Sequence, residues 1–296
     1  MKFLSAIVIV FLLPFRPALA QDDLLNILDQ ESPKETSIVE QTFKGTRLIN
    51  GHSIETRKKG VLDVIISHRF GRINSGGYQL FGLDDSNVRL GADYGITDRL
   101  NVGAGRNSFE KTYDGFLKYK FVRQQKNDSR NIPLSVAGFS SIALKTLKTG
   151  DPAGEPDFNS RLTYCYQILI AKKFTSSFSL QLSPTLVHRN AVPEFQDPND
   201  IYALGAGGRI KLTKRLSLNA EYYYQFNRRD GSLIENSAAI GFDIETGGHV
   251  FQLHFTNSRA MIEKGFITET TGDFFDGDVH FGFNISRTFQ LGKRAQ

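Results

Sequence analysis

Apolar and polar residues alternate along most of the chain after residue 60. In residues 87–97, Val88 and Leu90 share one parity, whereas Arg89 and Asp93 occupy the other. A period of two residues predicts β-strands whose two faces meet different surroundings. No helical periodicity of comparable length competes with this pattern, so the sequence predicts an all-β protein.

Segments with this alternation recur about twelve times, and each is about 9–13 residues long. Strands of ordinary globular proteins average about 5–6 residues, whereas tilted strands that cross a bilayer need about 9–11. The predicted strands therefore have the length of membrane-crossing strands. They cover residues 60–70, 87–97, 99–107, 112–123, 133–144, 161–174, 178–190, 201–213, 216–226, 235–246, 249–259 and 278–290.

The connections between these segments alternate between short turns and long polar loops. Residues 97–99 and 213–215 are tight turns, whereas 71–86, 145–160 and 259–277 are long loops. Membrane barrels have short periplasmic turns and longer outer loops. The sequence thus predicts a transmembrane antiparallel up-and-down β-barrel of about twelve strands. A soluble β-sandwich or a lipocalin-like barrel is the alternative.

Aromatic residues on the apolar parity gather near the strand ends, with aliphatic residues between them. Tyr202 and Phe226 lie toward the long loops, and Phe121 and Phe174 lie toward the short turns. Two aromatic belts around an aliphatic band are typical of a lipid-facing surface. We therefore expect lipid on the apolar face and a polar interior, with the first and last strands paired because lipid cannot satisfy an open sheet edge.

The first twenty residues read as a signal peptide. Lys2 gives a positive start, residues 3–13 an apolar core, and residues 18–20 a small-x-small cleavage site. We predict cleavage after Ala20 and location in the outer membrane. The mature chain then divides into an N-terminal periplasmic segment, residues 21–59, and the barrel, residues 60–296.

The role of residues 21–59 is left open by the sequence. Leu24, Leu25, Ile27 and Leu28 fit one apolar helical face, and residues 42–49 alternate weakly. The segment is interpreted as a plug of the lumen, a periplasmic tether, an extra paired strand or a plain linker.

Composition removes several classes of protein. A single cysteine, Cys165, excludes an internal disulfide framework and a multi-cysteine zinc site. The net charge is +5, but Lys and Arg are scattered, so we expect no nucleic-acid partner. Mean hydropathy of −0.28 disagrees with a bundle of transmembrane helices. No cofactor is expected.

The polar parity supplies ionisable residues that are predicted to line the lumen. Their signs nearly cancel, which disfavours a strongly ion-selective pore. They fit either a polar conduit for a small solute or a lumen of ion pairs that holds the barrel together. The predicted lining residues are Asp63, Arg69, Arg89, Asp93, Asp114, Lys118, Lys120, Arg161, Arg189, Arg209, Lys211, Glu221, Asp243 and Glu245.

Catalytic and metal sites receive little support. His68 and His188 point outward near the long loops, but we expect neither a hydroxyl nucleophile nor an orienting partner beside them, so lipolysis and enzymatic activity in general are not predicted. The acidic residues Asp273, Asp276 and Asp278 lack the spacing of an EF-hand, and no metal site is predicted.

Two stretches resemble a family of Gram-negative outer-membrane β-barrels defined as a domain of unknown function. The stretches are Thr42-Phe43-Lys44-Gly45-Thr46-Arg47 with Ile49-Asn50-Gly51-His52-Ser53, and Gly60-Val61-Leu62 with Ile66-Ser67-His68-Arg69-Phe70-Gly71. The resemblance implies a barrel and its location, and it implies no activity.

The sequence therefore predicts an outer-membrane barrel for passive passage or binding of a small polar solute. The alternative is a non-transporting structural or adhesion barrel whose long loops, residues 71–86, 145–160 and 259–277, meet a partner. The expected partners are outer-membrane lipid and, through the apolar and aromatic last strand, the barrel-assembly machinery.

Overall fold

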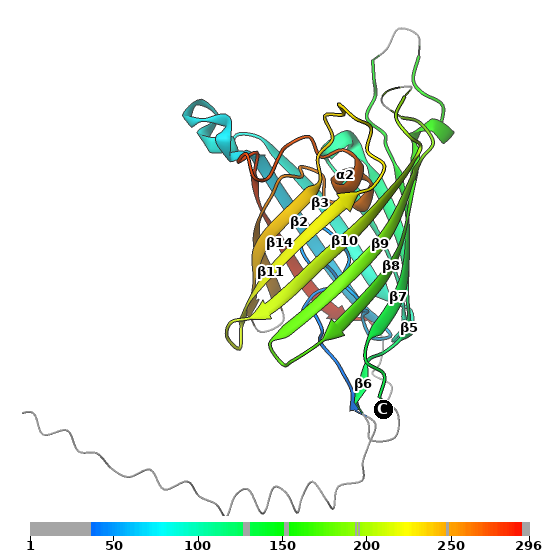
Figure 1. Ribbon diagram of the computed structural model, residues 1–296, viewed down its shortest axis with the longest axis vertical. Coiled ribbons are helices and arrows are strands. Elements are labelled where there is room, and N and C mark those ends of the chain that lie inside the picture. The colour runs from blue at the N-terminus through cyan, green and yellow to red at the C-terminus, as the bar shows by residue number, and fades with distance from the viewer. Residues whose placement is uncertain are drawn as a thin grey trace, which may run out of the picture.

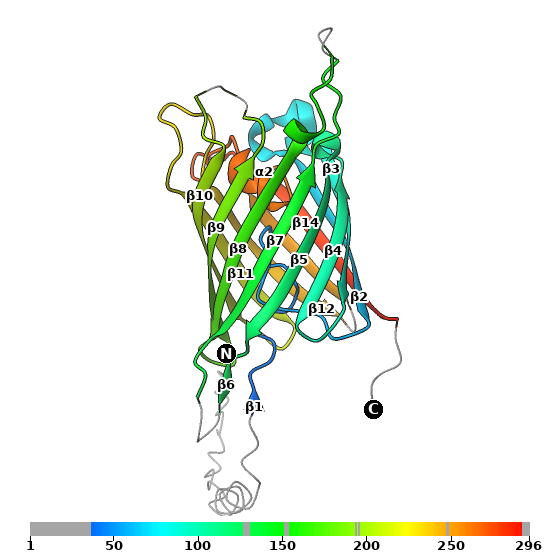
Figure 2. The ribbon, with the colours of Figure 1, turned by 90° about the vertical axis from the view of Figure 1, so that its right-hand side faces the viewer.

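The computed structural model describes residues 37–126, 131–150, 154–192, 194, 196–246 and 249–291. Twelve antiparallel strands form one closed barrel (Figures 1 and 2). The strands are β2 (Val61–Arg72), β3 (Ser86–Gly95), β4 (Leu100–Asn107), β5 (Tyr113–Val122), β7 (Ser135–Leu144), β8 (Leu162–Lys173), β9 (Phe178–Arg189), β10 (Asp200–Lys211), β11 (Leu216–Gln225), β12 (Ser237–Thr246), β13 (His249–Thr256) and β14 (His280–Gln290). The predicted fold class is confirmed, and every strand lies within a few residues of its predicted segment.

Each strand pairs with its neighbours in chain order, and β14 closes the ring on β2 from His280 opposite Arg72 to Gln290 opposite Val61. The register shifts twice, once between Lys120 and Val122 and once between His280 and Gly282. Closure leaves no free strand edge, as a lipid environment requires.

The two faces of the wall are inverted relative to a soluble protein. Leu90 and Ile168 face outward and are 59% and 46% exposed, whereas Arg89 and Lys118 face inward and are at most 1% exposed. Exposed aromatic residues mark both ends of the outer face, among them Phe121 at the short-turn end and Tyr202 at the long-loop end. This arrangement suits lipid outside.

The remaining elements are short. A two-stranded sheet of β1 (Ser37–Ile38) and β6 (Gln125–Lys126) lies below the short-turn end of the barrel (Figure 1). The helices are η1 (Ile73–Ser75), η2 (Gly77–Gly82), η3 (Phe109–Lys111), η4 (Asn159–Arg161) and α2 (Glu263–Thr268). None of the helices in these described ranges is long and apolar enough to cross a bilayer.

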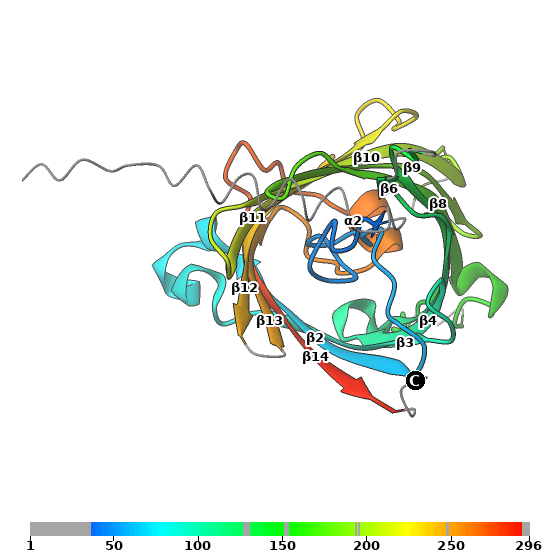
Figure 3. The ribbon, with the colours of Figure 1, turned by 90° about the horizontal axis from the view of Figure 1, so that it is seen from below.

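Two segments outside the wall occupy the interior of the barrel. Seen from the short-turn end, the chain between β1 and β2 and the helix α2 both lie inside the ring of strands (Figure 3). Side chains from residues 42–54 and from α2 are almost completely buried there. The predicted signal peptide and the apolar positions Leu24–Leu28 lie outside the described residues.

The inverted faces predict how charge is tolerated on the outer wall. Ile168→Arg places a cation near the middle of the lipid-facing strand β8 and should destabilise the barrel by about 2–4 kcal/mol. Leu212→Arg, at the short-turn rim where Leu212 is 51% exposed, should cost about 0–1 kcal/mol. Denaturant unfolding in lipid vesicles measures both, and equal costs would contradict the assigned orientation.

Candidate functional site

Residues 42–55 form a hairpin that stands inside the barrel, named here the lumen hairpin. Arg47 and His52 form an antiparallel bridge. The amide of Ser53 donates to the Thr46 carbonyl at 2.9 Å, and the amide of Leu48 donates to the Gly51 carbonyl at 2.9 Å. The turn therefore spans Leu48 to Gly51, and Gly at the last position of a four-residue turn is a common preference.

One carboxylate on the barrel wall holds the tip of the hairpin. Glu221 of β11 accepts the backbone amides of Ile49 at 3.3 Å, Asn50 at 2.7 Å and Gly51 at 3.3 Å. Hydrogen bonds to an ionised acceptor are stronger than neutral ones. A short turn with three inward-pointing amides is thus matched to a single buried anion.

Uncharged and cationic side chains of the wall hold the two arms. Gln181 of β9 accepts the amide of Ile54 at 2.7 Å and donates to the carbonyl of His52 at 2.8 Å. Lys118 of β5 donates to the carbonyl of Ser53 at 3.0 Å. Further bonds join the hairpin to the wall: Gln252 Nε2 to Leu48 O at 2.7 Å, Asn284 Nδ2 to Ile49 O at 3.2 Å, and Thr46 Oγ1 to Asp93 Oδ2 at 2.7 Å.

Packing at the tip leaves no room for a larger residue than glycine. A Cβ on Gly51 would stand 2.1 Å from the hydroxyl oxygen of Tyr223. Leu48 and Ile54 of the hairpin belong to one buried apolar cluster with inward-facing residues of β5 and β7–β11. The wall members of that cluster are Phe116, Ala137, Phe139, Cys165, Leu169, Ala171, Val187, Ile201, Ala203 and Tyr223.

A second buried segment, residues 257–270, enters from the long-loop end and carries α2; it is named here the lumen loop. Phe266 packs edge-to-face on Tyr223 with ring centroids 4.9 Å apart. Lys264 pairs with Glu110, between β4 and β5, at 2.7 Å, and also with Glu269. These contacts fasten the lumen loop to the inside of the barrel rather than above it.

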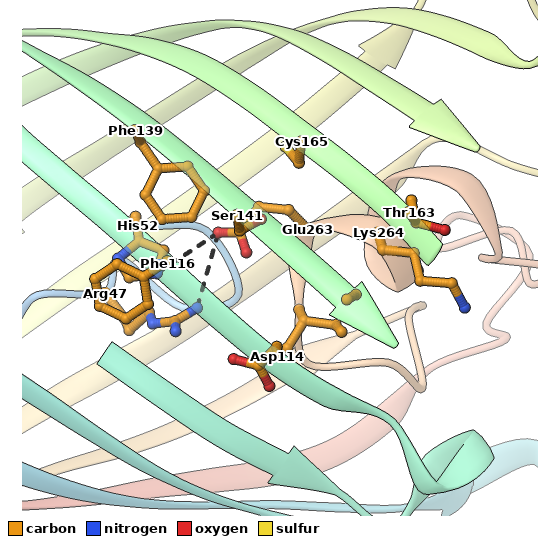
Figure 4. A pocket seen from close by; sticks show the side chains of 12 residues that line it. Arg47, His52, Asp114, Phe116, Phe139, Ser141, Thr163, Cys165, Glu263 and Lys264 are labelled. Atoms are coloured by element: carbon orange, nitrogen blue, oxygen red, sulfur yellow. Dashed lines mark ion pairs between the residues drawn. The ribbon is translucent and has the colours of Figure 1, made fainter. Parts of the chain in front are cut away.

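The lumen hairpin and the lumen loop meet near the middle of the barrel. Glu263 lies 3.8 Å from Arg47 and 3.9 Å from His52, whose ring stands between Phe116 and Phe139 (Figure 4). Burial lowers the pKa of His52 well below its usual value, and the nearby Arg47 lowers it further. Burial raises the pKa of Glu263, against the influence of Arg47. Burial and Arg47 both favour the neutral form of the His52 imidazole.

Very little space remains around this contact. The cavity beside His52, Glu263 and Cys165 has a volume of about 10 Å³, and a second cavity beside Thr46 and Arg57 has about 20 Å³. Volumes of that size hold about one water molecule. The short-turn end of the lumen, in contrast, widens into a vestibule of about 700 Å³ lined by charges of both signs, including Lys44, Lys120 and Glu245.

Most residues predicted to line the lumen are buried on the inner side of the wall. These are Asp63, Arg69, Arg89, Asp93, Lys118, Lys120, Arg189, Arg209, Glu221 and Asp243. Asp114, Lys211 and Glu245 face the same side and are half-buried. Arg161 differs: it lies in η4 at the long-loop end, and its Nε donates to the Pro156 carbonyl at 2.8 Å.

Opposite charges inside the barrel are combined in pairs. Arg89 contacts Asp114 within 2.5–2.9 Å. Glu245 pairs with Lys44 at 2.6 Å, and Lys120 lies 3.7 Å from Glu55. Lys44 and Glu55 belong to the hairpin segment, so the wall charges are neutralised partly by the chain that fills the lumen.

The outward histidines require a correction. We expected no orienting partner for either, but His188 Nδ1 lies 2.6 Å from Asp200 Oδ1. His68 stacks on Phe283 with ring centroids 5.0 Å apart, as an interfacial aromatic group does. The outward positions paired with His188 are Tyr164 and Asp200, and neither supplies the serine or cysteine nucleophile of a triad.

The acidic loop residues are engaged in contacts within the protein. Asp278 accepts a hydrogen bond from Asn74 at 2.7 Å and pairs with Arg72 at 3.4 Å. Asp85 pairs with Arg259 at 2.7 Å. Within the described ranges, no three acidic, histidine or cysteine side chains cluster as metal ligands.

These features define a membrane-bound β-barrel whose polar interior is occupied by its own chain. The chain belongs to the family described as membrane bound beta barrel domain (DUF5777), whose model matches residues 43–289. The match covers the lumen hairpin from residue 43 and the wall up to residue 289 of β14. The protein is an outer-membrane β-barrel.

Several solved outer-membrane structures are similar to this chain. The KdgM porin has 9% identity and a TM-score of 0.46 over 77% of this chain and 99% of its own. Omp33 of Acinetobacter baumannii has 9% identity and 0.43 over 77% and 97%. The COG4313 outer membrane channel from Pseudomonas putida F1 has 15% identity and 0.43 over 80% and 98%. No curated protein sequence matches significantly.

The anchor on Glu221 predicts how the hairpin responds to substitution. Glu221→Gln keeps one acceptor oxygen and places an NH2 donor against at least one of the three backbone amides. At least one bond is therefore lost and the others become neutral, so exposure of the lumen should increase roughly tenfold. Cys165 is the single cysteine, is 1% exposed and lines the cavity under the hairpin, so its labelling rate by a water-soluble maleimide reports that exposure. Asp197→Asn removes a carboxylate that pairs with Arg229 at the long-loop rim and has no contact with the hairpin, and it should leave the rate near wild type.

The buried imidazole predicts a pH effect. In the closed form, the lumen hairpin fills the barrel and the buried His52 resists protonation. When the hairpin leaves, His52 regains its ordinary pKa of about 6.5 and is protonated more readily. The closed form therefore loses stability as pH falls below about 6.5, by up to about tenfold per pH unit. Burial raises the pKa of Glu263, so protonation of Glu263 at lower pH stabilises the closed form. This effect opposes that of His52.

Comparison of wild type with His52→Asn at each pH isolates the histidine contribution. The ratio of their Cys165 labelling rates should rise as pH falls from about 7 to about 5, and thiolate content cancels in that ratio. A ratio that stays constant over this range would exclude His52 as the group responsible.

Proposed function

We propose that this protein is a porin-like barrel for passage of small polar solutes, and that the lumen hairpin is its plug. One observation carries the proposal. The wall side chains that would line an aqueous channel are the same groups that hold the hairpin: Lys118, Gln181 and Glu221 bond its backbone, and Asp93 accepts the hydroxyl of Thr46. Water can replace the hairpin at each of these groups, because each is polar or charged.

The hairpin can leave without breaking the wall. Its contacts with the strands run through side chains, whereas the strands pair with each other through the closed ladder. Both of its ends leave through the short-turn mouth: β1 lies below that mouth, and Thr56 Oγ1 donates to the carbonyl of Asp98 in the β3–β4 turn at 3.0 Å. Displacement toward the periplasm therefore requires no opening of the barrel.

The lumen loop acts as a second closure from the opposite side in this proposal. Its cation Lys264 is held by Glu110 and Glu269, and burial of Lys264 is outweighed by these two carboxylates, so its pKa is raised. The loop is thus fixed to the rim region and the hairpin to the middle of the wall. Passage requires a path past both segments.

The inward charges suggest weak ion selectivity for the open form. Their signs nearly balance over Asp63, Arg69, Arg89, Asp93, Asp114, Lys118, Lys120, Arg189, Arg209, Lys211, Glu221, Asp243 and Glu245. Small neutral or zwitterionic solutes fit such a lining better than a highly charged ion. We infer no catalytic role for these groups, because several of them hold the hairpin or form ion pairs with each other.

The outward aromatic residues of β14 support a further part of the proposal. Phe281, Phe283, Ile285 and Phe289 alternate along the strand that closes the ring. We propose that the barrel-assembly machinery recognises this strand before it pairs with β2, while its edge is still open.

Conductance in planar bilayers tests the proposed passage. Four proteins are compared: wild type, a deletion of residues 42–55, a variant with the lumen loop shortened by residues 259–269, and the double deletion. The double deletion should conduct steadily and with weak ion selectivity, because the polar wall then lines a continuous path. Wild type should be mostly closed, and the hairpin deletion should open more often.

Folding of each variant is checked by circular dichroism and by its shifted gel mobility without heating. A folded double deletion that conducts no ions and passes no solute in liposome swelling would overturn the proposed passage. Steady conductance from wild type equal to that of the hairpin deletion would instead overturn the role of the hairpin as a plug.

A further inference from the structure

Exposed and half-exposed cations are spaced around the short-turn end of the barrel. We name this group the basic collar: Lys59, Arg99, Lys172, Lys214, Arg215 and Arg287. Lys172 and Arg287 belong to the strands β8 and β14, and the other four lie in turns or just before a strand. The collar members come from separate parts of the chain that the closed ring brings to one rim.

The collar lies at the depth of the aromatic belt. On β8, Lys172 shares the outward parity of Ile168 and lies 4.9 Å from the ring centroid of Phe174. On β14, Arg287 shares the outward parity of Ile285 and lies 5.0 Å from the ring centroid of Phe289. Aromatic belts mark the boundary between hydrocarbon and head groups, so these cations stand at head-group depth.

The collar cations have no carboxylate partners among the described residues. The ion pairs at this end join Lys44 to Glu245, Arg57 to Asp63 and Lys120 to Glu55, and all of them face the lumen. None of the ion pairs found in the described ranges includes a collar residue. Asp98 is the nearest acid in these turns, and its carboxylate accepts the main-chain amide of Lys59 at 3.0 Å.

At the opposite rim, three arginines are paired with carboxylates, whereas Arg106 has no such pair within the described part of the chain. Arg228 contacts Glu235 at 2.6 Å, Arg229 contacts Asp197 at 2.8 Å, and Arg259 contacts Asp85 at 2.7 Å. At the short-turn rim, none of the six collar cations has a carboxylate partner in the described ranges, and each is therefore free to bind an external anion.

We propose that the basic collar binds the phosphate groups of anionic phospholipids in the periplasmic leaflet. Ammonium and guanidinium groups form charge-assisted bonds with phosphate oxygens, and basic clusters beside a membrane attract anionic head groups. A soluble acidic macromolecule is a weaker match, because Lys172 and Arg287 lie over belt aromatic rings on the lipid side rather than on the tips of the turns.

This inference is independent of the passage proposed above. A ring of bound head groups fixes the height of the barrel in the membrane and leaves the lumen unchanged. The collar therefore affects the position of the barrel in the membrane, whether or not the lumen hairpin moves.

Lipid selectivity of the full chain tests the collar. The folded protein is reconstituted in phosphatidylcholine vesicles that contain trace spin-labelled phosphatidylglycerol or spin-labelled phosphatidylcholine. The fraction of immobilised label should show a several-fold preference for phosphatidylglycerol at low salt. That preference should shrink at about 1 M salt, where the screening length is about 3 Å.

The variant Lys172→Gln/Arg287→Gln should lose up to about fivefold in that preference for each cation removed. Adding Lys214→Gln/Arg215→Gln should reduce it further. The matched control is Arg106→Gln, because Arg106 is an exposed outward cation at the opposite end and lies 5.6 Å from the ring centroid of Tyr113. The control should keep the wild-type preference.

Three results would overturn the proposal. One is equal immobilisation of both labelled lipids by wild type. Another is an equal loss of preference in Arg106→Gln and in the collar variant. The third is displacement of the labelled phosphatidylglycerol by soluble polyglutamate bound at the same cations, which would assign the collar to an acidic macromolecule. Circular dichroism and unheated gel mobility confirm that each variant is folded.

Discussion

The absence of hydrogen-bonding partners in lipid governs the whole molecule. Every strand must be paired on both sides, so twelve strands close into a ring with β14 against β2. Lipid outside then forces polar residues to the inside, opposite to a soluble core. Polar groups inside a narrow ring need partners in turn, and the chain supplies them with a hairpin whose backbone is held by Glu221, Gln181 and Lys118.

The interior therefore combines two kinds of packing. One side of the lumen carries apolar side chains such as Phe139 and Leu169, which pack with Leu48 and Ile54 of the hairpin and with Phe266 of the lumen loop. The same strands β5, β9 and β11 also bind the hairpin through Lys118, Gln181 and Glu221, and β3, β13 and β14 add further polar contacts. Apolar contacts favour filling the ring, whereas the polar contacts are ones that water can replace. The balance between them sets how firmly the lumen is closed.

The wall was predictable from sequence, because a period of two residues identifies the strands and the face of the wall on which each side chain lies. The occupied interior was harder. On β8, Cys165 and Leu169 face the lumen although both are apolar. Alternation alone does not show what such inward apolar side chains pack against. Asn50-Gly51 was the available signal for a turn within residues 42–55. The docking of the hairpin on Glu221 joins residues 170 apart in the chain, and sequence spacing does not reveal such a contact. The contact of Asp200 with His188 was also not apparent from the sequence.

The position of the hairpin along the chain bears on how the barrel is assembled. It precedes β2, the first strand of the ring, on which β14 closes, and its two arms leave by the same mouth. A loop that goes in and comes back out through one opening needs no free end to be threaded. The filled barrel is therefore topologically unknotted, and the ring can close first and receive the hairpin later, or close around it, with the same final connectivity.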